Sequence, residues 1–186
     1  FAALQTEGAQ LAAKFSQNVL DATDAFALYF DNAEPLAGLP EDAMAMFAAA
    51  AQAEGKSGYK IGLQMPHYLA VMQYADRREL REEVYRAYVT RASELSNEGR
   101  FDNSPNITRR LEITLQEAKL LGYTNFAELS LATKMADSPA QVLDFLRDLA
   151  KRAKPFAEQD FAAVQAFARD TLAIENPQPW DLVYAS

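Results

Sequence analysis

The sequence predicts a mainly α-helical fold: an irregular arrangement of several helices with one small two-stranded β element. Three observations support this class. Apolar residues recur at helical spacing along most of the 186 residues. Helix start signals, in which proline stands in a first turn or follows a hydroxyl residue, recur along the chain. Only two short segments, 25–30 and 59–64, carry residues typical of strands.

The first helix is expected from Gln5 to about Asp21. Its apolar stripe consists of Leu11, Phe15, Val19 and Leu20. Residues 25–30, AFALYF, are too short and too aromatic for a helix. They predict a buried strand that ends at a turn formed by residues 31–32.

A second helix is expected after Pro40. The segment EDAMAMFAAAAQAE is rich in alanine and has its acidic residues at the positive N-terminal end. Gly55 is expected to end it, because glycine adopts the left-handed conformation of a helix terminus. Residues 59–64, YKIGLQ, alternate and are expected to pair with 25–30. Two strands alone are marginal, so helices must cover them.

Pro66 is expected to begin a short helix, and Asp76 to cap a longer helix, with Glu79 completing a capping-box pattern. The buried stripe of the longer helix is expected to comprise Leu80, Val84, Tyr88, Arg91 or Ala92, and Leu95. Charged residues spaced four apart are expected on its outer face, where opposite charges support each other, at Arg78, Glu82 and Arg86.

The C-terminal half predicts three further helices. Ser104 and Pro105 begin the first of these, and Gly122 ends it. Its stripe is expected to comprise Ile107, Leu111, Leu115, Ala118 and Leu121. Asn125 with Glu128 begins a short helix, and Ser138 with Gln141 begins a long one. Pro155 lies inside the long helix and is expected to kink it, because the apolar pattern continues beyond it. Residues 97–105 are expected to form an exposed loop.

Composition excludes several classes of function. The net charge of −8 opposes general binding to phosphate backbones, so no nucleic acid partner is expected. Apolar content of 49% with 24% charged residues is typical of a globular protein. The apolar runs are too short to cross a membrane, and no membrane partner is expected. Cysteine is absent, so there is no disulfide framework and the cytoplasm is the default location.

His67 is the single histidine, which removes most catalytic options. A His-Glu-x-x-His zinc site needs two histidines on one helix face and a third ligand, and this chain cannot supply them. A Ser–His–Asp triad is formally possible, but no Gly-x-Ser-x-Gly sequence frames a nucleophile. His67 is expected to pack or hydrogen-bond locally. The alternative is a polar group that lines a binding cleft.

Other motifs favour structural interpretations. Gly55–Lys56–Ser57 resembles the end of a phosphate-binding loop, but position 50 is alanine, and a helix stop is expected instead. A solvated, salt-bridged helix face is expected for Arg77, Arg78, Arg81, Arg86 and Arg91, with carboxylate recognition by one of them as the alternative. Core or helix-packing roles are expected for Tyr59, Tyr68, Tyr74, Tyr85 and Tyr88.

Four stretches carry a resemblance to a known family. They are residues 58–94 (GYKIGLQMPHYLAVMQYADRRELREEVYRAYVTRASE), 120–155 (LLGYTNFAELSLATKMADSPAQVLDFLRDLAKRAKP), the upstream words LDATDAFALYF and PLAGLPEDAMAMF, and the terminal PWDLVYAS. In these stretches the chain resembles the oligopeptidase A/thimet oligopeptidase family of zinc metallopeptidases, in its bacterial oligopeptidase A branch. The resemblance runs in order over essentially the whole chain.

The resemblance implies a mostly helical zinc peptidase that cleaves short, unstructured peptides in a narrow channel between two halves. In that family a His-Glu-x-x-His helix and a downstream Glu hold the zinc, and the Glu of the motif activates water. These residues lie C-terminal to the matched part. No catalytic or metal-binding residue is therefore carried over to this chain, and no substrate-binding residue is identified.

Residues 1–186 are thus expected to be a single segment of the non-catalytic N-terminal half, with the catalytic domain outside the chain. The parent would bind zinc and short peptides, and this segment would form part of the channel wall and pack on the catalytic half. Alone it is expected to bind no zinc and to be inactive. The alternative is a stand-alone helical protein-interaction domain without catalytic activity. The segment predicts an exposed apolar patch and self-association, whereas the alternative predicts internal apolar faces throughout.

Overall fold

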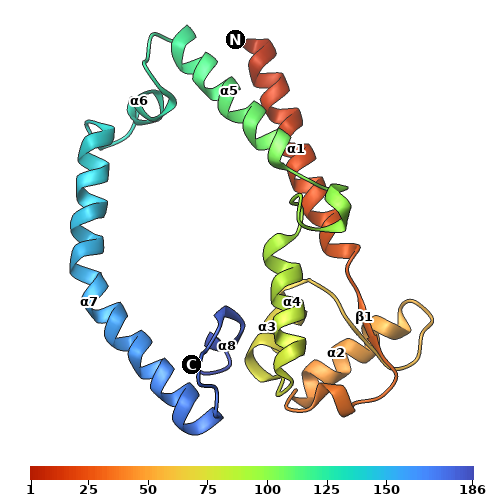
Figure 1. Cartoon of the computed structure of the whole chain (residues 1–186). Helices are drawn as coiled ribbons and strands as arrows, with labels where there is room; N and C mark the ends of the chain where they lie inside the picture. Colours follow the sequence, from red (N-terminus) through yellow and green to blue (C-terminus); the bar gives the residue numbers. More distant parts are fainter. The chain divides into compact units, whose positions relative to one another are not determined.

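The computed structural model describes all 186 residues, which form two compact units (Figure 1). Unit 1 comprises residues 1–17 and 103–162, and unit 2 comprises residues 18–102 and 163–186. Helices α1 (Ala2–Asp24) and α7 (Pro139–Leu172) each contribute residues to both units. The chain is mostly helical with one two-stranded sheet, which confirms the predicted fold class.

The sheet of unit 2 consists of β1 (Leu28–Phe30) and β2 (Tyr59–Ile61), which are antiparallel with Leu28 opposite Ile61. The predicted pairing of 25–30 with 59–64 is confirmed, although each strand is only three residues long. Gly58 enters β2 with a φ of +83°, and a Cβ there would collide with the carbonyl oxygen of Phe30. Glycine is therefore required at this turn.

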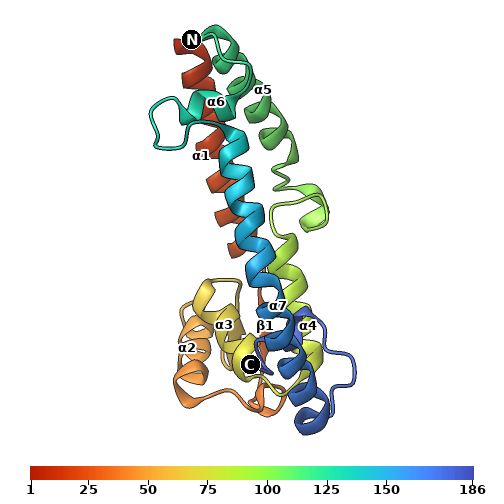
Figure 2. The same cartoon turned by 90° about the vertical axis from the view of Figure 1, so that its left-hand side faces the viewer.

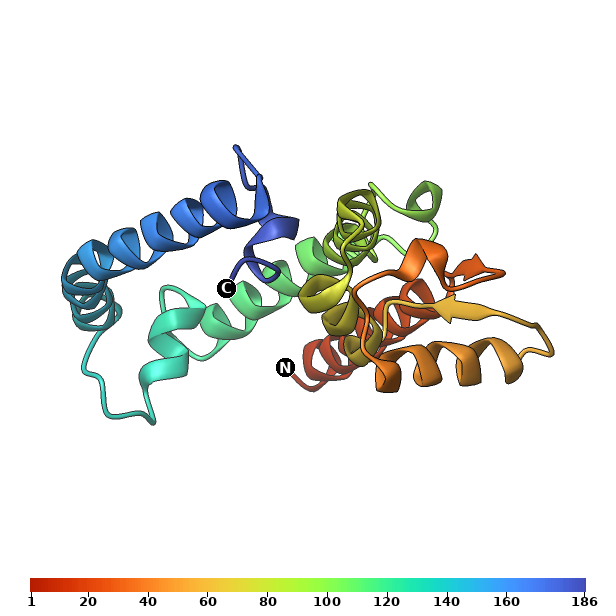
Figure 3. The same cartoon turned by 90° about the horizontal axis from the view of Figure 1, so that it is seen from below.

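Two strands alone are marginal, and unit 2 adds helical elements to them. They are α2 (Glu41–Gln52), α3 (Met65–Tyr74) and α4 (Arg78–Thr90), with a 3₁₀ turn at Glu34–Leu36 and the short α8 (Pro179–Leu182). Figure 3 shows α2 alongside the strands, where it makes extensive contact with β2. The core of unit 2 comprises Leu36, Ala43, Phe47, Ile61, Leu63, Val71, Met72, Ala75, Leu80, Val84 and Trp180.

Two details of α4 differ from expectation. Asp76 does not cap the helix: the N-cap is Arg77, which makes no side-chain cap, and the Asp76 carboxylate accepts a hydrogen bond from the Tyr184 hydroxyl at 2.8 Å. The buried stripe also stops early. The helix ends at Thr90, so Leu95 lies beyond it and is 74% exposed.

The predicted loop at 97–105 is ordered around a small second cluster. A 3₁₀ turn spans Asn97–Gly99, and Phe101 is buried against Ala22 and Ala92. The expectation of an exposed loop is therefore wrong at Phe101, because its ring supplies apolar contacts to this cluster.

Unit 1 pairs the first turns of α1 with α5 (Ser104–Leu120), which lie side by side in Figures 1 and 2. Polar contacts join them: Gln5 donates to Glu117 at 2.7 Å, and Arg109 pairs with Glu7 at 2.7 Å. The remaining elements are α6 (Phe126–Leu131) and the first part of α7. Asn125 caps α6 by accepting from the Glu128 amide at 3.0 Å, as predicted.

The apolar stripe of α5 is largely exposed rather than buried against α1. The residues of α5 that are buried are Asn106, Ile113, Glu117 and Ala118, whereas Ile107, Leu111, Leu115 and Leu121 are 42–66% exposed. The expected stripe is wrong apart from Ala118. The polar residues Arg109 and Glu117 of α5 contact α1, whereas most of the apolar stripe stays exposed.

Helix α7 runs for 34 residues without interruption through Pro155, so the proline does not break it (Figure 2). The Ser138 hydroxyl accepts from the Gln141 amide at 3.2 Å, as expected of the start signal. Large apolar side chains along the helix are exposed: Leu143, Phe145, Leu146, Leu149, Phe156, Phe161 and Phe167. No helix of the chain is long and apolar enough to span a membrane.

Candidate functional site

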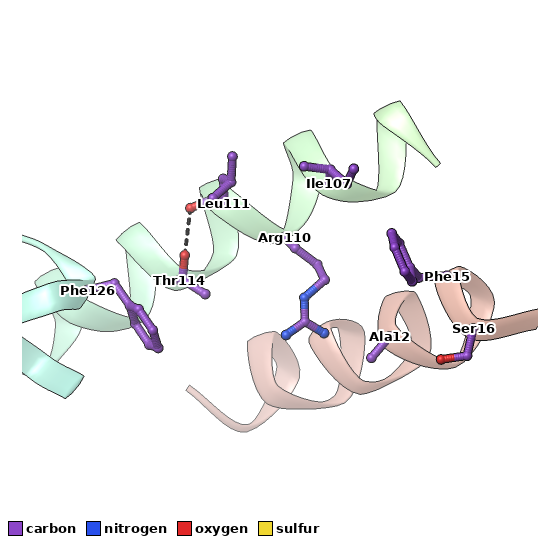
Figure 4. Close-up of a pocket in the computed structure, with 8 residues that line it drawn as sticks. All are labelled: Ala12, Phe15, Ser16, Ile107, Arg110, Leu111, Thr114 and Phe126. Carbon is purple, nitrogen blue, oxygen red and sulfur yellow. Dashed lines mark hydrogen bonds between the residues drawn. The ribbon is translucent and has the colours of Figure 1, made fainter. Parts of the chain in front are cut away.

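A pocket lies within unit 1, between α1 and α5, and we call it the α1–α5 groove (Figure 4). It has a volume of about 500 Å³ and is lined by Ala12, Phe15, Ser16, Ile107, Arg110, Leu111, Thr114 and Phe126. Figure 4 shows Phe15 and Phe126 toward its two ends, with Arg110 between them. The walls are predominantly apolar, which suits burial of another apolar surface rather than a polar reaction.

Arg110 is the one charged residue among those that line this groove. Its Nη1 donates to the carbonyl oxygen of Gly8 at 2.8 Å, and no carboxylate lies within ion-pair distance. The nearby Glu117 instead accepts from Gln5. The hydroxyl of Thr114 donates to the carbonyl of Leu111 at 2.9 Å. The groove thus offers one half-buried cation and no nucleophile–base pair, an arrangement for binding rather than catalysis.

A second polar cluster lies in unit 2, where Asp181 of α8 is fully buried between two arginines of α4. Arg78 donates twice, from Nε at 3.0 Å and from Nη2 at 2.8 Å, and Nη2 of Arg81 donates at 2.9 Å. The Gln178 amide adds a further bond at 2.9 Å. Burial acts to raise the pKa of Asp181, but these hydrogen bonds outweigh it and hold that pKa below its ordinary value.

Arg81 corrects the expectation of a solvated arginine face. Its side chain is 1% exposed and also donates to the carbonyl oxygen of Ala75 at 2.6 Å. Arg86 does follow that expectation, because it is exposed and pairs with Glu82 at 2.8 Å. Two arginines, Arg78 and Arg81, therefore recognise a carboxylate, where the alternative held that one would, and the carboxylate is the chain's own Asp181. We call Arg78, Arg81 and Asp181 the Asp181 clamp, and its role is to hold α8 on α4.

His67 packs locally, which confirms the structural interpretation. Its Nδ1 accepts a hydrogen bond from the Gly62 amide at 3.0 Å, and its ring meets Phe47 edge-on with centroids 5.0 Å apart. Burial, with a smaller contribution from the positive charge of Lys60, lowers the pKa of His67.

The lowered pKa of His67 is directly measurable because the chain has no other histidine. Its ring C–H resonances are expected to titrate with a midpoint below about 6.5, the ordinary value for histidine. The unfolded chain binds the proton more readily, so this contribution to stability is present above pH ~6.5 and is lost as the pH falls through the folded-state pKa. A midpoint at or above the ordinary value contradicts the packing described here, and a chemically unfolded sample provides the reference.

The other candidate motifs have structural explanations. Gly55 has a φ of +71° and follows the end of α2, as a helix stop requires. Lys56 lies 3.5 Å from the ring centroid of Tyr29, so the Gly55–Lys56–Ser57 turn packs its lysine on an aromatic ring. Tyr68 stacks on Tyr88 with centroids 3.9 Å apart. The remaining tyrosines differ: Tyr59 and Tyr85 pack against the core, and Tyr74 is 47% exposed.

No group of three or more His, Asp or Glu side chains is arranged to hold a metal ion. The residues present do not fit a zinc centre, and the expectation that the isolated chain binds no zinc stays a prediction. The two clusters described above were not predicted. The capping box formed by Gln178 and Asp181 could have indicated from the sequence that Asp181 has a structural role. No sequence pattern indicates a role for Arg110.

Comparisons with a family model and with individual known proteins point to the same family of peptidases. Residues 71–186 match the model of peptidase family M3. The chain is 47% identical over 184 residues to oligopeptidase A of Salmonella typhimurium, and 46% identical over 184 residues to oligopeptidase A of Escherichia coli. It is 31% identical over 182 residues to dipeptidyl carboxypeptidase of Escherichia coli.

These matches cover 97–98% of this chain but only 26–27% of each relative, so the chain spans about a quarter of their length. The matched residues include α4, α5, α7 and the Asp181 clamp. The chain belongs to peptidase family M3.

Proposed function

We propose that this chain is a segment of a zinc metallo-oligopeptidase that hydrolyses short, unstructured peptides in the cytoplasm. The observation that carries the proposal is the 47% identity, over 98% of the chain, to a protein named oligopeptidase A. Residues 1–186 are then one segment of the non-catalytic N-terminal half, and the catalytic half and its peptide substrates are the partners.

Within that enzyme the segment forms part of the wall of the substrate channel and packs against the catalytic half. The exposed apolar faces of α5 and α7 support this role, because apolar surface of this extent marks an interaction site. A stand-alone interaction domain was expected to keep its apolar faces internal. The exposed leucines and phenylalanines of these two helices do not favour that alternative.

Zinc, when bound by the parent, supplies the activated water of peptide hydrolysis. The ligands would come from a His-Glu-x-x-His helix and a downstream Glu outside this chain. The residues of this chain have a structural role: they narrow the channel so that folded proteins are excluded, and they pack against the catalytic half. His67 takes no part in the chemistry, because its ring is engaged with Gly62 and Phe47.

The proposal is tested by comparing this chain with the polypeptide encoded by its complete reading frame. The longer protein is expected to contain stoichiometric zinc and to cleave a short fluorogenic peptide. Its activity should be lost with a chelator and restored by zinc. The 186-residue chain is expected to do neither, because it lacks the ligands.

His67→Gln in the longer protein is the control, and it should retain both the zinc content and zinc-dependent cleavage. Zinc-dependent cleavage by the 186-residue chain would refute its assignment to the non-catalytic half. A complete reading frame without a His-Glu-x-x-His sequence would refute the peptidase function itself.

A further inference from the structure

We propose that the first part of α4 is a recognition surface for a tryptophan–aspartate turn, and that residues 176–186 of a second copy of this chain can occupy it in place of the chain's own segment. The inference goes beyond the proposed function and does not depend on it. It identifies an interaction surface in unit 2, the chemistry of its partner, and a dimer that forms by exchange of one segment between two chains. Residues 176–186 are called the Trp180 segment below.

The contacts of the Trp180 segment with the rest of unit 2 converge on one short stretch. Its hydrogen bonds and ring contacts with other parts of the chain all end on residues 76–86, in the first part of α4 and just before it. Arg81 alone donates from Nη2 to Asp181 at 2.9 Å and lies over the Tyr184 ring, 3.9 Å from its centroid. Because these partners are continuous in sequence, a segment from another chain can meet all of them at once.

The chemistry of the contact is that of a specific interface. Trp180 is 7% exposed, and its ring lies beside Tyr85 at a centroid distance of 5.9 Å and under the Arg86 guanidinium at 4.8 Å. Asp181 follows it directly and accepts from the two arginines of the Asp181 clamp. Tryptophan and arginine are the residue types that most often carry the binding energy of an interface. The surface therefore specifies a buried tryptophan followed by a carboxylate.

The Trp180 segment is already shaped for binding by its own contacts. Pro177 and Pro179 restrict its backbone, and Gln178 forms a capping box with Asp181, in which the Gln178 amide donates to the carboxylate at 2.9 Å. A turn that is restricted in this way loses little conformational entropy when it docks. The segment is thus expected to bind in trans with the conformation that it has within its own chain.

Helix α7, which carries the segment, is packed weakly. Of its 34 residues only Ala168 is buried, so the position of the Trp180 segment depends chiefly on its contacts with residues 76–86. The same contacts form within one chain or between two chains, and the balance is set by local concentration. A tethered segment has an effective concentration of up to about millimolar. The exchanged dimer of the unmodified chain is therefore expected to be a minor species at micromolar concentration.

The test removes the competing contact within each chain. The site variant, Arg78→Met with Arg81→Met, keeps an intact Trp180 segment. The segment variant, Trp180→Phe with Asp181→Ala, keeps an intact α4 surface. Because Trp180 is the only tryptophan, all tryptophan fluorescence in a mixture of the two comes from the segment of the site variant.

Titration of the segment variant into the site variant is expected to shift the Trp180 emission to shorter wavelengths and to give a mixed dimer in sedimentation. A chain that carries all four substitutions is the matched control, because it has the same exposed apolar faces of α5 and α7 but no arginines to accept Asp181. That control should require at least about tenfold higher concentration for the same shift, since the buried charge pair cannot form.

A synthetic peptide of residues 176–186 keeps the test decisive if the substitutions impair folding. Added to the segment variant, it is expected to raise the midpoint of thermal unfolding, because a ligand that binds only the folded chain stabilises it. If the segment variant is unfolded alone, the peptide is expected to restore its helical circular dichroism. At least about tenfold more of the peptide with Asp181→Asn should be needed for the same effect.

The same fluorescence and sedimentation with the segment variant as with the four-substitution control would overturn the exchange, because any association would then use another surface. Stabilisation by the peptide without a mixed dimer would confirm the recognition surface but overturn its use by a second copy. No effect of the peptide would overturn the recognition surface itself. None of these outcomes bears on the peptidase function, which is tested separately with the longer protein.

Discussion

Replacement of Asp181 by alanine is expected to destabilise unit 2 by about 3–5 kcal/mol, the range found when one partner of a buried ion pair is removed. The substitution leaves Arg81, whose side chain is 1% exposed, without its counter-ion. It also removes the acceptor for the Gln178 amide and the Arg78 side chain, so α8 loses its attachment to α4.

Urea unfolding followed by the fluorescence of Trp180 measures this effect, because Trp180 is the only tryptophan and lies in the core of unit 2. Asp170→Ala is the matched control: its exposed carboxylate pairs with Arg169, and a change within about 0.5 kcal/mol is expected. The double variant Arg81→Met, Asp181→Leu should recover much of the loss, since apolar replacements can substitute for a buried pair. A loss from Asp181→Ala no larger than that of Asp170→Ala would show that the clamp contributes little.

The loss of stability caused by Asp181→Ala is expected to depend on pH. The pKa of Asp181 is lowered in the folded chain, so its contribution is fully present above the unfolded value of about 3.9 and is lost as the pH falls through the folded-state pKa. The difference in stability between the unmodified chain and Asp181→Ala should therefore narrow below about pH 4.

Phe47→Ala is expected to cost unit 2 about 3–5 kcal/mol of unfolding free energy, because it removes a fully buried ring from the centre of the core. Phe47 is 0% exposed and meets the His67 ring edge-on, so the truncation leaves a cavity beside a histidine. The His67 pKa should move back toward its ordinary value as the ring gains water.

Phe156→Ala is the control for this truncation, because the same side chain is removed at a position that is 67% exposed on α7. Its effect on the isolated chain should stay within about 0.5 kcal/mol. Urea denaturation of both variants and a histidine titration of Phe47→Ala provide the measurements. Similar losses from the two variants would contradict the placement of the core around Phe47.

Local signals predicted the helices well because caps and stops act within a few residues. Pro66, Gly55 and the Asn125 cap each stand where the sequence indicates. The prediction that Asp76 caps α4 is wrong, because its carboxylate accepts a hydrogen bond from the distant Tyr184 hydroxyl rather than from amides of the helix. The expected buried stripe of α5 is wrong apart from Ala118, because periodicity indicates only that a face is apolar and not that another element covers it.

The clusters of the candidate site depend on contacts between distant residues. Arg81 and Asp181 are separated by 100 residues, and Arg110 reaches Gly8 across 102. Each arginine occurs in an ordinary charged helix sequence, so burial of Arg81 and the lack of a carboxylate at Arg110 follow only from tertiary packing. The family resemblance could be recognised from the sequence because it rests on long continuous stretches of residues rather than on contacts between distant residues.

The discontinuity of unit 2 sets an order of events during synthesis. Arg81 leaves the ribosome 100 residues before Asp181. At about 5–20 residues per second the interval is roughly 5–20 s. Throughout that time α4 carries an arginine whose burial site does not yet exist, and Trp180 is missing from the core. The nascent helices of unit 2 are therefore accessible to chaperones and proteases until α8 has been synthesised. The core of unit 2 is completed only after residues 103–162, which belong to unit 1, have been translated.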